Sequence, residues 1–193
     1  MMKCLVVYSH PNPKSFNHAI METVTETLKS RGHEVVVRDL HALPFDPVLK
    51  PVDFEGIQSG NLPADIKVEQ DHIAWADALV VIHPVWWTGL PAMFKGYIDR
   101  VFCYGFAYSF DAKGLVPQLK GKKVLIINTQ GTPKDAYDAS GMFEAMKMTS
   151  DKGIYEFCGL EVIDHIFLPA VPMVKDEVRK GYLEQVKETM GKL

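Results

Sequence analysis

The 193-residue sequence has few cysteines, no long apolar run and no dense stretch of lysine and arginine. Its three cysteines are odd in number and far apart, and no Cys/His spacing typical of a zinc site occurs. No stretch approaches the length of a membrane span, and the apolar run near the amino terminus is too short for a signal peptide. We therefore expect a reduced, cytoplasmic protein that binds no metal and inserts in no membrane.

Several catalytic fingerprints are also missing. There is no GxGxxG after the first apolar run, so a Rossmann dinucleotide site loses its main support. A GxSxG elbow and an HExxH motif are absent, which argues against a hydrolase triad and a metalloprotease. The formal charge of −3 gives no general attraction to nucleic acid. The seven histidines are scattered, and we expect most of them at the surface or at helix ends, with Cys158 packed as a small apolar residue.

What the sequence does contain is an alternation of strand and helix patterns. Nearly continuous apolar runs, typical of parallel strands buried on both faces, occur at 4–9, 34–39, 78–83, 124–129 and, more weakly, 160–168. Helical spacing follows at 15–31, 93–102, 141–158 and 174–191, whereas 41–63 reads as a long irregular excursion. The pattern predicts one α/β domain over 1–193, a three-layer flavodoxin-like fold with a five-stranded parallel sheet in the order 2-1-3-4-5.

Ligands of such sheets bind beyond the carboxyl ends of the strands, where three loops attract attention. The first is "SHPNPKSFN", residues 9–17. Ser15 is placed to cap the following helix, whose free N–H groups would face an anion. Ser15 and Asn17 offer neutral donors, and Lys14 or His10 offers positive charge. The loop is thus a candidate phosphate site; the alternative is an ordinary proline-stiffened turn before a capped helix.

The second loop is "HPVWWTGLPAMFKG", residues 83–96. Two adjacent tryptophans, Trp86 and Trp87, lie between Pro84 and Gly89. Exposed tryptophans in a loop are costly unless they cover something, and a flat heteroaromatic ring is a suitable partner. The alternative is that a tryptophan belongs to the core or to a dimer interface, and we expect this of one of the two.

The third loop is "NTQGTPKDAYDASG", residues 128–141. Asn128, Thr129 and Gln130 present polar groups, and Gly131 permits close backbone approach. Such donors suit the polar edge of a flavin, although a plain surface loop is the alternative. Together the three loops predict a phosphate cradle, an aromatic wall and a polar edge.

Extended motifs support this interpretation: "SFNHA", "WWTGLPAMFKGYIDRVF", "GFAYSFDAKG", "NTQG" and "FCGLEV". On these motifs the chain resembles the NAD(P)H:quinone oxidoreductase family, the DT-diaphorase-like enzymes of flavodoxin fold, over nearly its whole length. The resemblance implies a homodimer with a flavin near the subunit interface. It also implies two-electron (hydride) transfer from NAD(P)H to quinones or related small electrophiles, with both substrates using one slot in turn, hence ping-pong kinetics.

The resemblance assigns roles by position. It places the phosphate and ribityl end on His10, Ser15, Phe16 and Asn17, the ring on Pro84, Val85, Trp86, Trp87 and Thr88, and the polar edge on Asn128, Thr129, Gln130 and Gly131. Tyr137 becomes the cofactor contact nearest the reacting face and the one catalytic candidate. Tyr108 and Phe110 match the aromatic positions that close the substrate slot from the partner subunit.

Two departures from the family pattern stand out. No histidine lies between His83 and His165, so the family's charge-stabilising histidine after the tyrosine is missing. Residues 45–63 are shorter than the segment that holds adenosine in FAD-binding members, which favours FMN with FAD as the alternative. Two other functions remain open: an accessory subunit of a potassium-efflux system, and a one-electron carrier of flavodoxin type, which the near-neutral charge disfavours.

Overall fold

The computed structural model describes all residues 1–193 and has a five-stranded parallel sheet at its centre. The strands are β1 (Lys3–Tyr8), β2 (Glu34–Asp39), β3 (Ala78–Pro84), β6 (Lys123–Thr129) and β7 (Glu161–Leu168). Their spatial order is β2-β1-β3-β6-β7, and all neighbouring pairs are parallel. Counted along the chain this is 2-1-3-4-5, so the predicted flavodoxin-like sheet is confirmed, with each strand within about a residue of its expected bounds.

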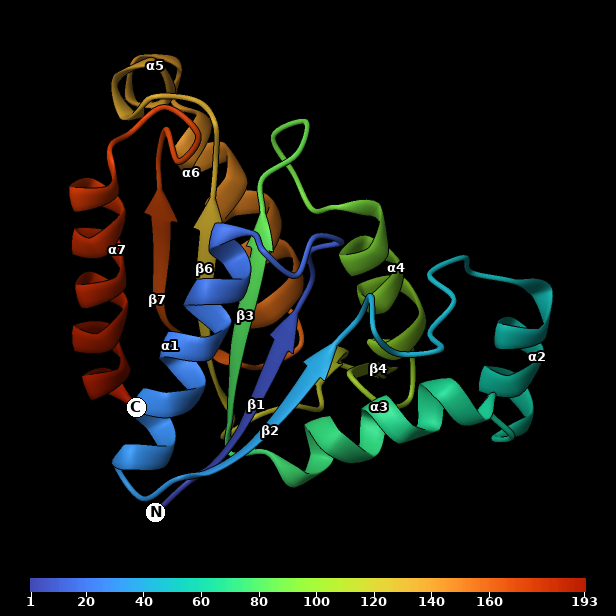
Figure 1. Cartoon of the computed structure of the whole chain (residues 1–193). Coiled ribbons are helices and arrows are strands. Elements are labelled where there is room, and N and C mark those ends of the chain that lie inside the picture. The colour runs from blue at the N-terminus through green and yellow to red at the C-terminus, as the bar shows by residue number, and fades with distance from the viewer.

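Helices cover both faces of the sheet (Figure 1). On one face lie α1 (Phe16–Ser30), α7 (Asp176–Thr189) and the short 3₁₀ turn η2 (Met190–Lys192). On the other lie α3 (Ala64–Trp75), α4 (Ala92–Val101) and the helix η1 (Met148–Glu156). Two separate apolar cores result, one on each side, which explains why the strands are apolar at successive positions. None of the helices combines the length and apolar composition that a membrane crossing needs.

Helix α1 shows how the local sequence fixes the element after the first loop. The Ser15 hydroxyl oxygen accepts a hydrogen bond from the His18 N–H at 3.2 Å, as a helix N-cap does. Ile20, Val24 and Leu28 recur at the spacing that puts them on one face, and all are buried against the sheet. The predicted cap is therefore confirmed, and it fixes where the first loop ends.

The expectation for residues 41–63 was wrong in part, because they include helix α2 (Pro51–Ser59). Its position depends on Arg100 of α4, whose guanidinium donates to both carboxylate oxygens of Asp53, each at 2.9 Å. The same side chain also donates to Asp65 at 2.5 Å and to the Asp46 carbonyl at 2.7 Å. These partners are far apart in sequence, so no local periodicity announces the helix.

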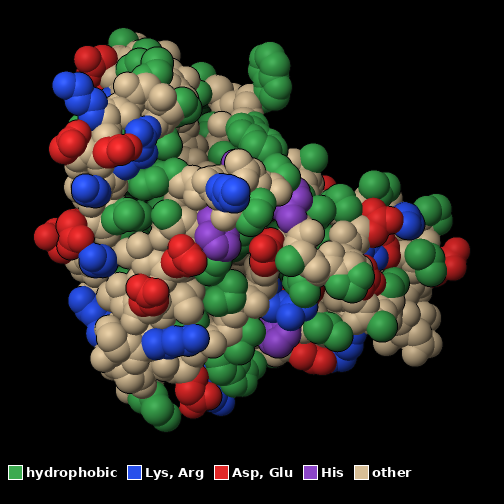
Figure 2. All heavy atoms as spheres, in the orientation of Figure 1, with side chains coloured by type: hydrophobic (Ala, Val, Ile, Leu, Met, Phe, Trp, Pro, Cys, Tyr) green, Lys and Arg blue, Asp and Glu red, His purple; other side chains and the backbone are tan.

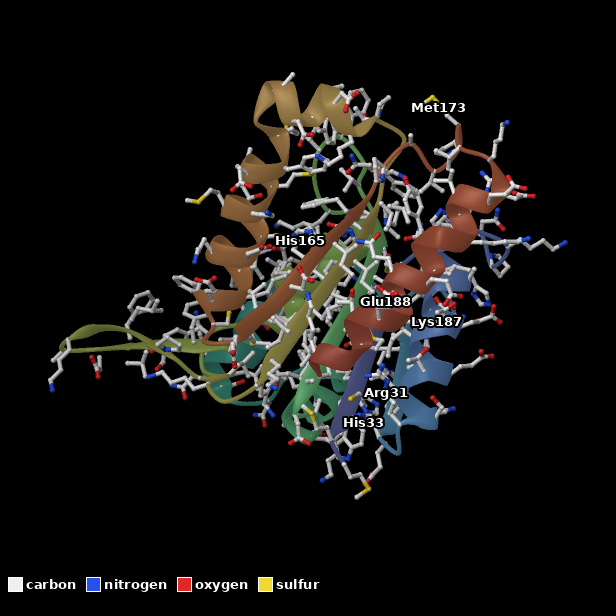
Figure 3. The ribbon with its side chains drawn as sticks, turned by 90° about the vertical axis from the view of Figure 1, so that its left-hand side faces the viewer. Arg31, His33, His165, Met173, Lys187 and Glu188 are labelled. Carbon is white, nitrogen blue, oxygen red and sulfur yellow. The ribbon has the colours of Figure 1, made fainter.

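The remaining elements lie beyond the sheet. Strands β4 (Tyr108–Asp111) and β5 (Gly114–Pro117) form an antiparallel hairpin of their own, which the sequence pattern did not predict. Figure 3 shows this hairpin projecting away from the body of the molecule. After β6 come α5 (Lys134–Ser140) and α6 (Met142–Lys147), and α6 continues into η1, which is a π-helix. The helix predicted over 141–158 is thus present, but wider than an α-helix in its second half.

Candidate functional site at the carboxyl end of the sheet

The structure brings the three loops identified in the sequence together. The Asn17 side-chain amide donates to the Thr129 hydroxyl at 2.7 Å, which joins the first loop to the third. The Val85 N–H donates to the Thr129 carbonyl at 2.7 Å, joining the second loop to the third. The rings of His10 and Trp86 meet edge to face with centroids 5.9 Å apart, joining the first loop to the second. All three predicted segments therefore border one site at the carboxyl ends of β1, β3 and β6.

The first loop is held by its own side chains. The His10 Nδ1 atom accepts from the Asn12 N–H at 3.0 Å, and the Asn12 side-chain oxygen accepts from the Lys14 N–H at 2.9 Å. Burial lowers the pKa of His10, which favours its neutral ring and makes it a weaker source of positive charge than the sequence suggested. Phe16 packs on the α7 side, against Tyr182, with ring centroids 6.4 Å apart.

The second loop contains a strained turn. Trp86 and Gly89 exchange backbone hydrogen bonds of 3.2 and 3.1 Å, and the two residues between them, Trp87 and Thr88, have φ values of 51° and 56°. A β-branched residue with positive φ is unusual, and such strain costs about 1–3 kcal/mol per residue. Trp87 is 100% exposed, and hydrophobic atoms stand clear of the surface above β3 in Figure 2. Neither tryptophan is a core residue, so of the two alternatives expected for one of them only the dimer interface stays a prediction.

Two buried carbonyl oxygens at this edge have no partner in the protein. Asn17 and Gln130 are each 4% exposed, yet Asn17 Oδ1 and Gln130 Oε1 accept no hydrogen bond. An unpaired buried acceptor costs about 1–3 kcal/mol, so native proteins seldom leave two in one place. Both oxygens are enclosed by protein, and the pair is a candidate position for hydroxyl or N–H groups of a ligand.

Beside these loops lies a cavity of about 450 Å³, a size suited to a small organic molecule. Val85, Thr88 and Asn128 from the predicted site line it. The rest of its wall is His83, Gly89, Leu90, Lys95, Met146, Thr149, Ser150, Ile154 and His165, which come from β3, α4, α6, η1 and β7 and the loop after β3. The cavity therefore extends from the predicted ring position toward η1.

Other predicted residues lie outside this cavity. Tyr137 is on α5, where its ring packs edge to face on Phe143 with centroids 5.5 Å apart. Tyr108 and Phe110 are on the projecting hairpin, and Tyr108 borders a separate, mostly apolar groove of about 400 Å³. Pro84 ends β3, and Gly131 follows β6 at the rim. The single chain thus does not bring Tyr137, Tyr108 and Phe110 into the cavity.

A buried polar cluster, which the sequence pattern did not predict, lies in the wall of the cavity. We expected most histidines at the surface or at helix ends, but the side chains of His83 and His165 are buried in the sheet. They flank Asn128. Burial lowers the pKa of His83 to about 4, so its ring is neutral at physiological pH. The strand pattern could have indicated this cluster. His83 and Asn128 are paired in register on neighbouring strands, and they face the same side of the sheet as the core residues two positions earlier on each strand.

A doubly wound parallel sheet, with a ligand-sized cavity and unpaired buried acceptors at its carboxyl edge, defines a flavodoxin-like α/β protein. The chain matches the model of the family described as having a flavodoxin-like fold over residues 2–190. It belongs to that family, in the branch of the NAD(P)H and quinone oxidoreductases, and it is an oxidoreductase of that type. The resemblance recognised in the motifs is thereby confirmed.

Two relatives and two solved structures illustrate the similarity. An uncharacterized NAD(P)H oxidoreductase of Haemophilus influenzae is 32% identical over 100% of this chain and 96% of its own length. Human ribosyldihydronicotinamide dehydrogenase [quinone] is 31% identical over 93% of this chain and 86% of its own. A Streptococcus mutans crystal structure superposes with TM-score 0.87 at 36% identity, covering 100% of both chains. The NAD(P)H:quinone oxidoreductase of Methanothermobacter marburgensis gives TM-score 0.89 at 27% identity, covering 98% of this chain and 97% of that one.

Proposed function

We propose that this protein transfers hydride from NAD(P)H to a quinone or a related small electrophile by means of a bound flavin. The observation that carries the proposal is the pair of buried, unpaired acceptors, Asn17 Oδ1 and Gln130 Oε1, at the edge where the three loops meet. A flavin presents ribityl hydroxyls and a ring N–H, which are donors of the kind that these two oxygens lack. The relatives named for NAD(P)H and quinone chemistry support the same function.

The residues present fit a flavin mononucleotide. The start of α1, with Ser15 and Lys14, offers one cradle for one phosphate, which favours FMN over FAD. Asn17 and His10 border the ribityl end, Trp86, Trp87 and Val85 the ring, and Gln130 with its neighbours the polar edge. These assignments rest on the contacts described above and on the order of the loops around the sheet.

The chain's contribution to the reaction is orientation and exclusion of water. A bound flavin supplies the hydride acceptor and donor that amino acids lack. The turn at Trp87 and Thr88 forms one wall of the slot, and the cavity toward η1 leaves room for one planar substrate at a time. Donor and acceptor would therefore occupy the slot in turn, which predicts ping-pong kinetics. Tyr137 is retained as a catalytic candidate only if movement of α5 or binding of substrate brings its hydroxyl to the slot.

A second copy of the chain is the proposed occupant of the apolar groove bordered by Leu49, Phe54, Tyr104, Tyr108 and Phe157. Phe54 and Tyr104 are about half exposed, and an apolar surface of this kind marks an interaction site. The neighbouring β4–β5 hairpin carries Phe110, also exposed, and projects from the body, so a partner would cover it (Figure 3). We propose a homodimer in which the hairpin of one subunit reaches the slot of the other. In sedimentation experiments, the Phe110→Glu variant should shift toward the monomer. A parent protein that itself sediments as a monomer would refute the dimer.

The direct test is the spectrum of the purified protein and its titration with FMN. We expect a yellow protein that releases FMN, whose colour NAD(P)H bleaches in stopped-flow mixing and quinone restores. Initial rates at varied NAD(P)H and quinone should give parallel double-reciprocal lines. A protein that takes up neither FMN nor FAD would end the proposal. Slow reduction by NAD(P)H would favour the one-electron carrier instead. The accessory-subunit alternative receives no support from the fold or the relatives.

Substitution of Asn17 tests the observation on which the proposal depends. Asn17→Ala removes the buried Oδ1 acceptor and the bond to Thr129. FMN affinity should fall about tenfold, because a hydrogen bond of this kind contributes about 1–1.5 kcal/mol. Asn61→Ala, at an exposed asparagine outside the site, is the matched control and should bind FMN as the parent does. Equal FMN affinity in both variants would remove Asn17 from the site.

Trp87 allows a test that leaves the fold intact. Its side chain is 100% exposed, so Trp87→Ala should change the free energy of unfolding by less than about 0.5 kcal/mol. Loss of an aromatic wall should nevertheless weaken FMN binding or raise the KM for the quinone several-fold. Val178→Ala, at an exposed position on α7, serves as the control. Unchanged binding and kinetics for Trp87→Ala would separate the tryptophan from the site.

A further inference from the structure

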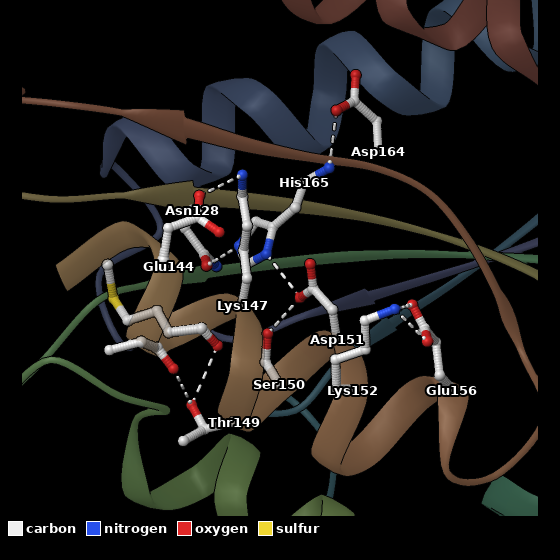
Figure 4. Close-up of polar contacts among 12 residues, drawn as sticks. Asn128, Glu144, Lys147, Thr149, Ser150, Asp151, Lys152, Glu156, Asp164 and His165 are labelled. Atoms are coloured by element: carbon white, nitrogen blue, oxygen red, sulfur yellow. Dashed lines mark hydrogen bonds and ion pairs between the residues drawn. The ribbon is translucent and has the colours of Figure 1, made fainter. Parts of the chain in front are cut away.

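Four buried side chains form one continuous hydrogen-bonded chain behind the cavity. Asp151 of η1 faces His165 Nδ1 at 2.8 Å, and His165 Nε2 faces Asn128 Oδ1 at 2.7 Å (Figure 4). The Asn128 amide nitrogen in turn lies 3.2 Å from the ring of His83. His83, Asn128 and His165 come from three neighbouring strands, on the sheet face that packs against η1, and all three line the cavity.

The direction of each hydrogen bond follows from the groups at the end of the chain. The amide atom of Asn128 near the His83 backbone carbonyl, at 3.1 Å, must be its NH₂ group, because a carbonyl only accepts. Asn128 Oδ1 therefore faces His165 Nε2, which must carry a hydrogen. His83 Nδ1 lies 2.9 Å from the Pro84 carbonyl and must also be protonated. That leaves His83 Nε2 free to accept from Asn128.

The charge on His165 is decided at its other nitrogen. His165 Nδ1 lies 2.8 Å from Asp151 Oδ1, a carboxylate oxygen that accepts, so this nitrogen too faces an acceptor. The Ser150 hydroxyl donates to the same carboxylate oxygen at 2.6 Å, so that oxygen acts as an acceptor toward both neighbours. His165 then donates through both ring nitrogens, and every polar atom of the ring is satisfied.

Other charged groups around His165 are engaged elsewhere. Asp164, next to it on β7, accepts from the His165 backbone N–H at 2.8 Å and pairs with Lys192 of η2. On the helix side, Lys147 pairs with Glu144 and Lys152 with Glu156, and all four are at the surface. His83, on β3, is neutral because burial lowers its pKa to about 4. Asp151 is thus the only anion that directly faces the His165 ring.

We propose that His165, paired with Asp151, is a buried imidazolium that fixes the Asn128 amide and places positive charge in the cavity wall, where it favours the negative charge that reduction gives a bound flavin. His165 is thus a positioning residue, acting through Asn128 and through its field. The inference rests on the proposed flavin function for its consequence, but not for the charge of His165 itself. No residue between 84 and 164 supplies another histidine.

The location of the cluster argues for more than structural support. A buried ion pair contributes little net stability and is often replaceable by apolar residues. Here the pair lies in the wall of a cavity beside the predicted ring position, where a charge acts at low dielectric on whatever is bound. Its carboxylate is delivered by a π-helical turn, a geometry often found at functional sites.

The first experiment reads the charge of His165 in the flavin-free protein. Nitrogen NMR of protein with isotope-labelled histidine distinguishes a doubly protonated ring from either neutral tautomer. We expect the His165 signal of the parent protein at pH 7 to be that of an imidazolium. In Asp151→Asn the ring should be neutral at the same pH. A neutral His165 ring at pH 7 in the parent protein would overturn the proposal, whatever the protein binds.

The second experiment measures the consequence for a bound flavin. In His165→Gln the Asp151 carboxylate stays buried without its cation, so the ratio of affinities for reduced and oxidised FMN should fall at least about tenfold, or about 30 mV in the two-electron potential. Asp151→Asn removes both charges and should have a smaller effect. His72→Gln, at the far end of the sheet on α3, is the matched control and should leave the potential unchanged.

The outcomes separate this inference from the proposed function. An unchanged potential in His165→Gln, with FMN bound and the circular dichroism spectrum intact, would overturn the electrostatic role. Failure of the parent protein to bind any flavin would refute the proposed function, while the NMR result would still decide the charge of His165. If His165→Gln fails to fold, Asp151→Asn, which keeps nearly the same shape, provides the potential measurement. There the proposal expects the smaller fall given above, and an unchanged value counts against it.

Discussion

Two buried charged clusters lie on the same side of the sheet, and they differ in what surrounds them. In the Arg100 cluster a guanidinium pairs with Asp53 and Asp65 and lies over the ring of Phe45, 5.2 Å from its centroid. In the His165 cluster an imidazole pairs with Asp151 and contacts Asn128. Arg100 has its partners on every side and lines no part of the cavity, whereas His165, with Asn128 and His83, forms the cavity wall.

The difference shows how to separate a structural charge from a functional one. Arg100 holds α2 and α3 against α4, so its removal should be felt as a loss of stability wherever it is measured. His165 contacts strands that are already joined by backbone hydrogen bonds, so we expect its charge to act mainly on a molecule in the cavity. Substitutions of Arg100 should therefore lower the stability of the fold, whereas substitutions of His165 should change the chemistry at the cavity.

The largest effect is expected at Arg100. Arg100→Met should lower the free energy of unfolding by about 3–5 kcal/mol, because it leaves the Asp53 carboxylate buried and unpaired. Urea unfolding followed by circular dichroism measures the change. FMN affinity of the protein that remains folded should be unaltered.

Two further substitutions serve as controls for this first prediction. Lys67→Ala, which breaks an exposed pair with Asp71, should cost less than about 1 kcal/mol. Arg100→Lys should lie between, since an ammonium lacks the planar fork that engages both Asp53 oxygens. Loss of FMN affinity in folded Arg100→Met, with stability retained, would erase the distinction between the clusters.

An intermediate effect is expected from acid. The pKa of His83 is lowered from 6.5 to about 4 in the folded protein, so the unfolded chain binds this proton more readily. Its stabilising contribution is complete above pH 6.5 and is lost as pH falls toward 4, amounting to about 3–4 kcal/mol. Comparison of urea midpoints for the parent and His83→Gln across this range measures it. Parallel pH profiles for the two proteins would show that His83 does not titrate in this way.

The smallest effect is expected at the strained turn. Thr88→Gly should raise the free energy of unfolding by about 1 kcal/mol, because glycine adopts a positive φ without the clash of a Cβ atom. FMN or quinone binding should nevertheless weaken, since Thr88 lines the cavity. Ala170→Gly, at another residue with positive φ (52°) but outside the cavity wall, should stabilise without changing binding. Equal binding by both variants would make the turn at Thr88 merely structural.

Much of the fold was predictable because its signals are local. The apolar runs of β1, β2, β3, β6 and β7 gave strands and their parallel arrangement, and Ser15 marked the start of α1. Helix α2 was not predictable in this way, because its anchor is Arg100, distant in sequence. The β4–β5 hairpin and the π-helical widening of η1 likewise depend on tertiary packing more than on periodicity.

The loops of the candidate site were predictable, but the buried polar cluster in the cavity wall was not. Asn17 and Val85 both bond to Thr129, and Trp86 contacts His10, as the order of the loops around a flavodoxin-like sheet required. His165 escaped notice because Asp151, its partner, lies in a helix whose register the sequence alone does not fix. A histidine within an apolar strand is a signal that gains meaning only once the neighbouring strands are known.

The π-helical form of η1 has a consequence for how this chain can vary. An α-helix turns by about 100° per residue, so removing one residue from the stretch around Met148 would rotate Ser150 and Asp151 away from β7. Conservative exchanges there would do far less damage than a change in length. Deletion scanning across the segment should therefore show a sharp intolerance to lost residues, and relatives with a partner for the β7 histidine should keep the residue count of this helix constant.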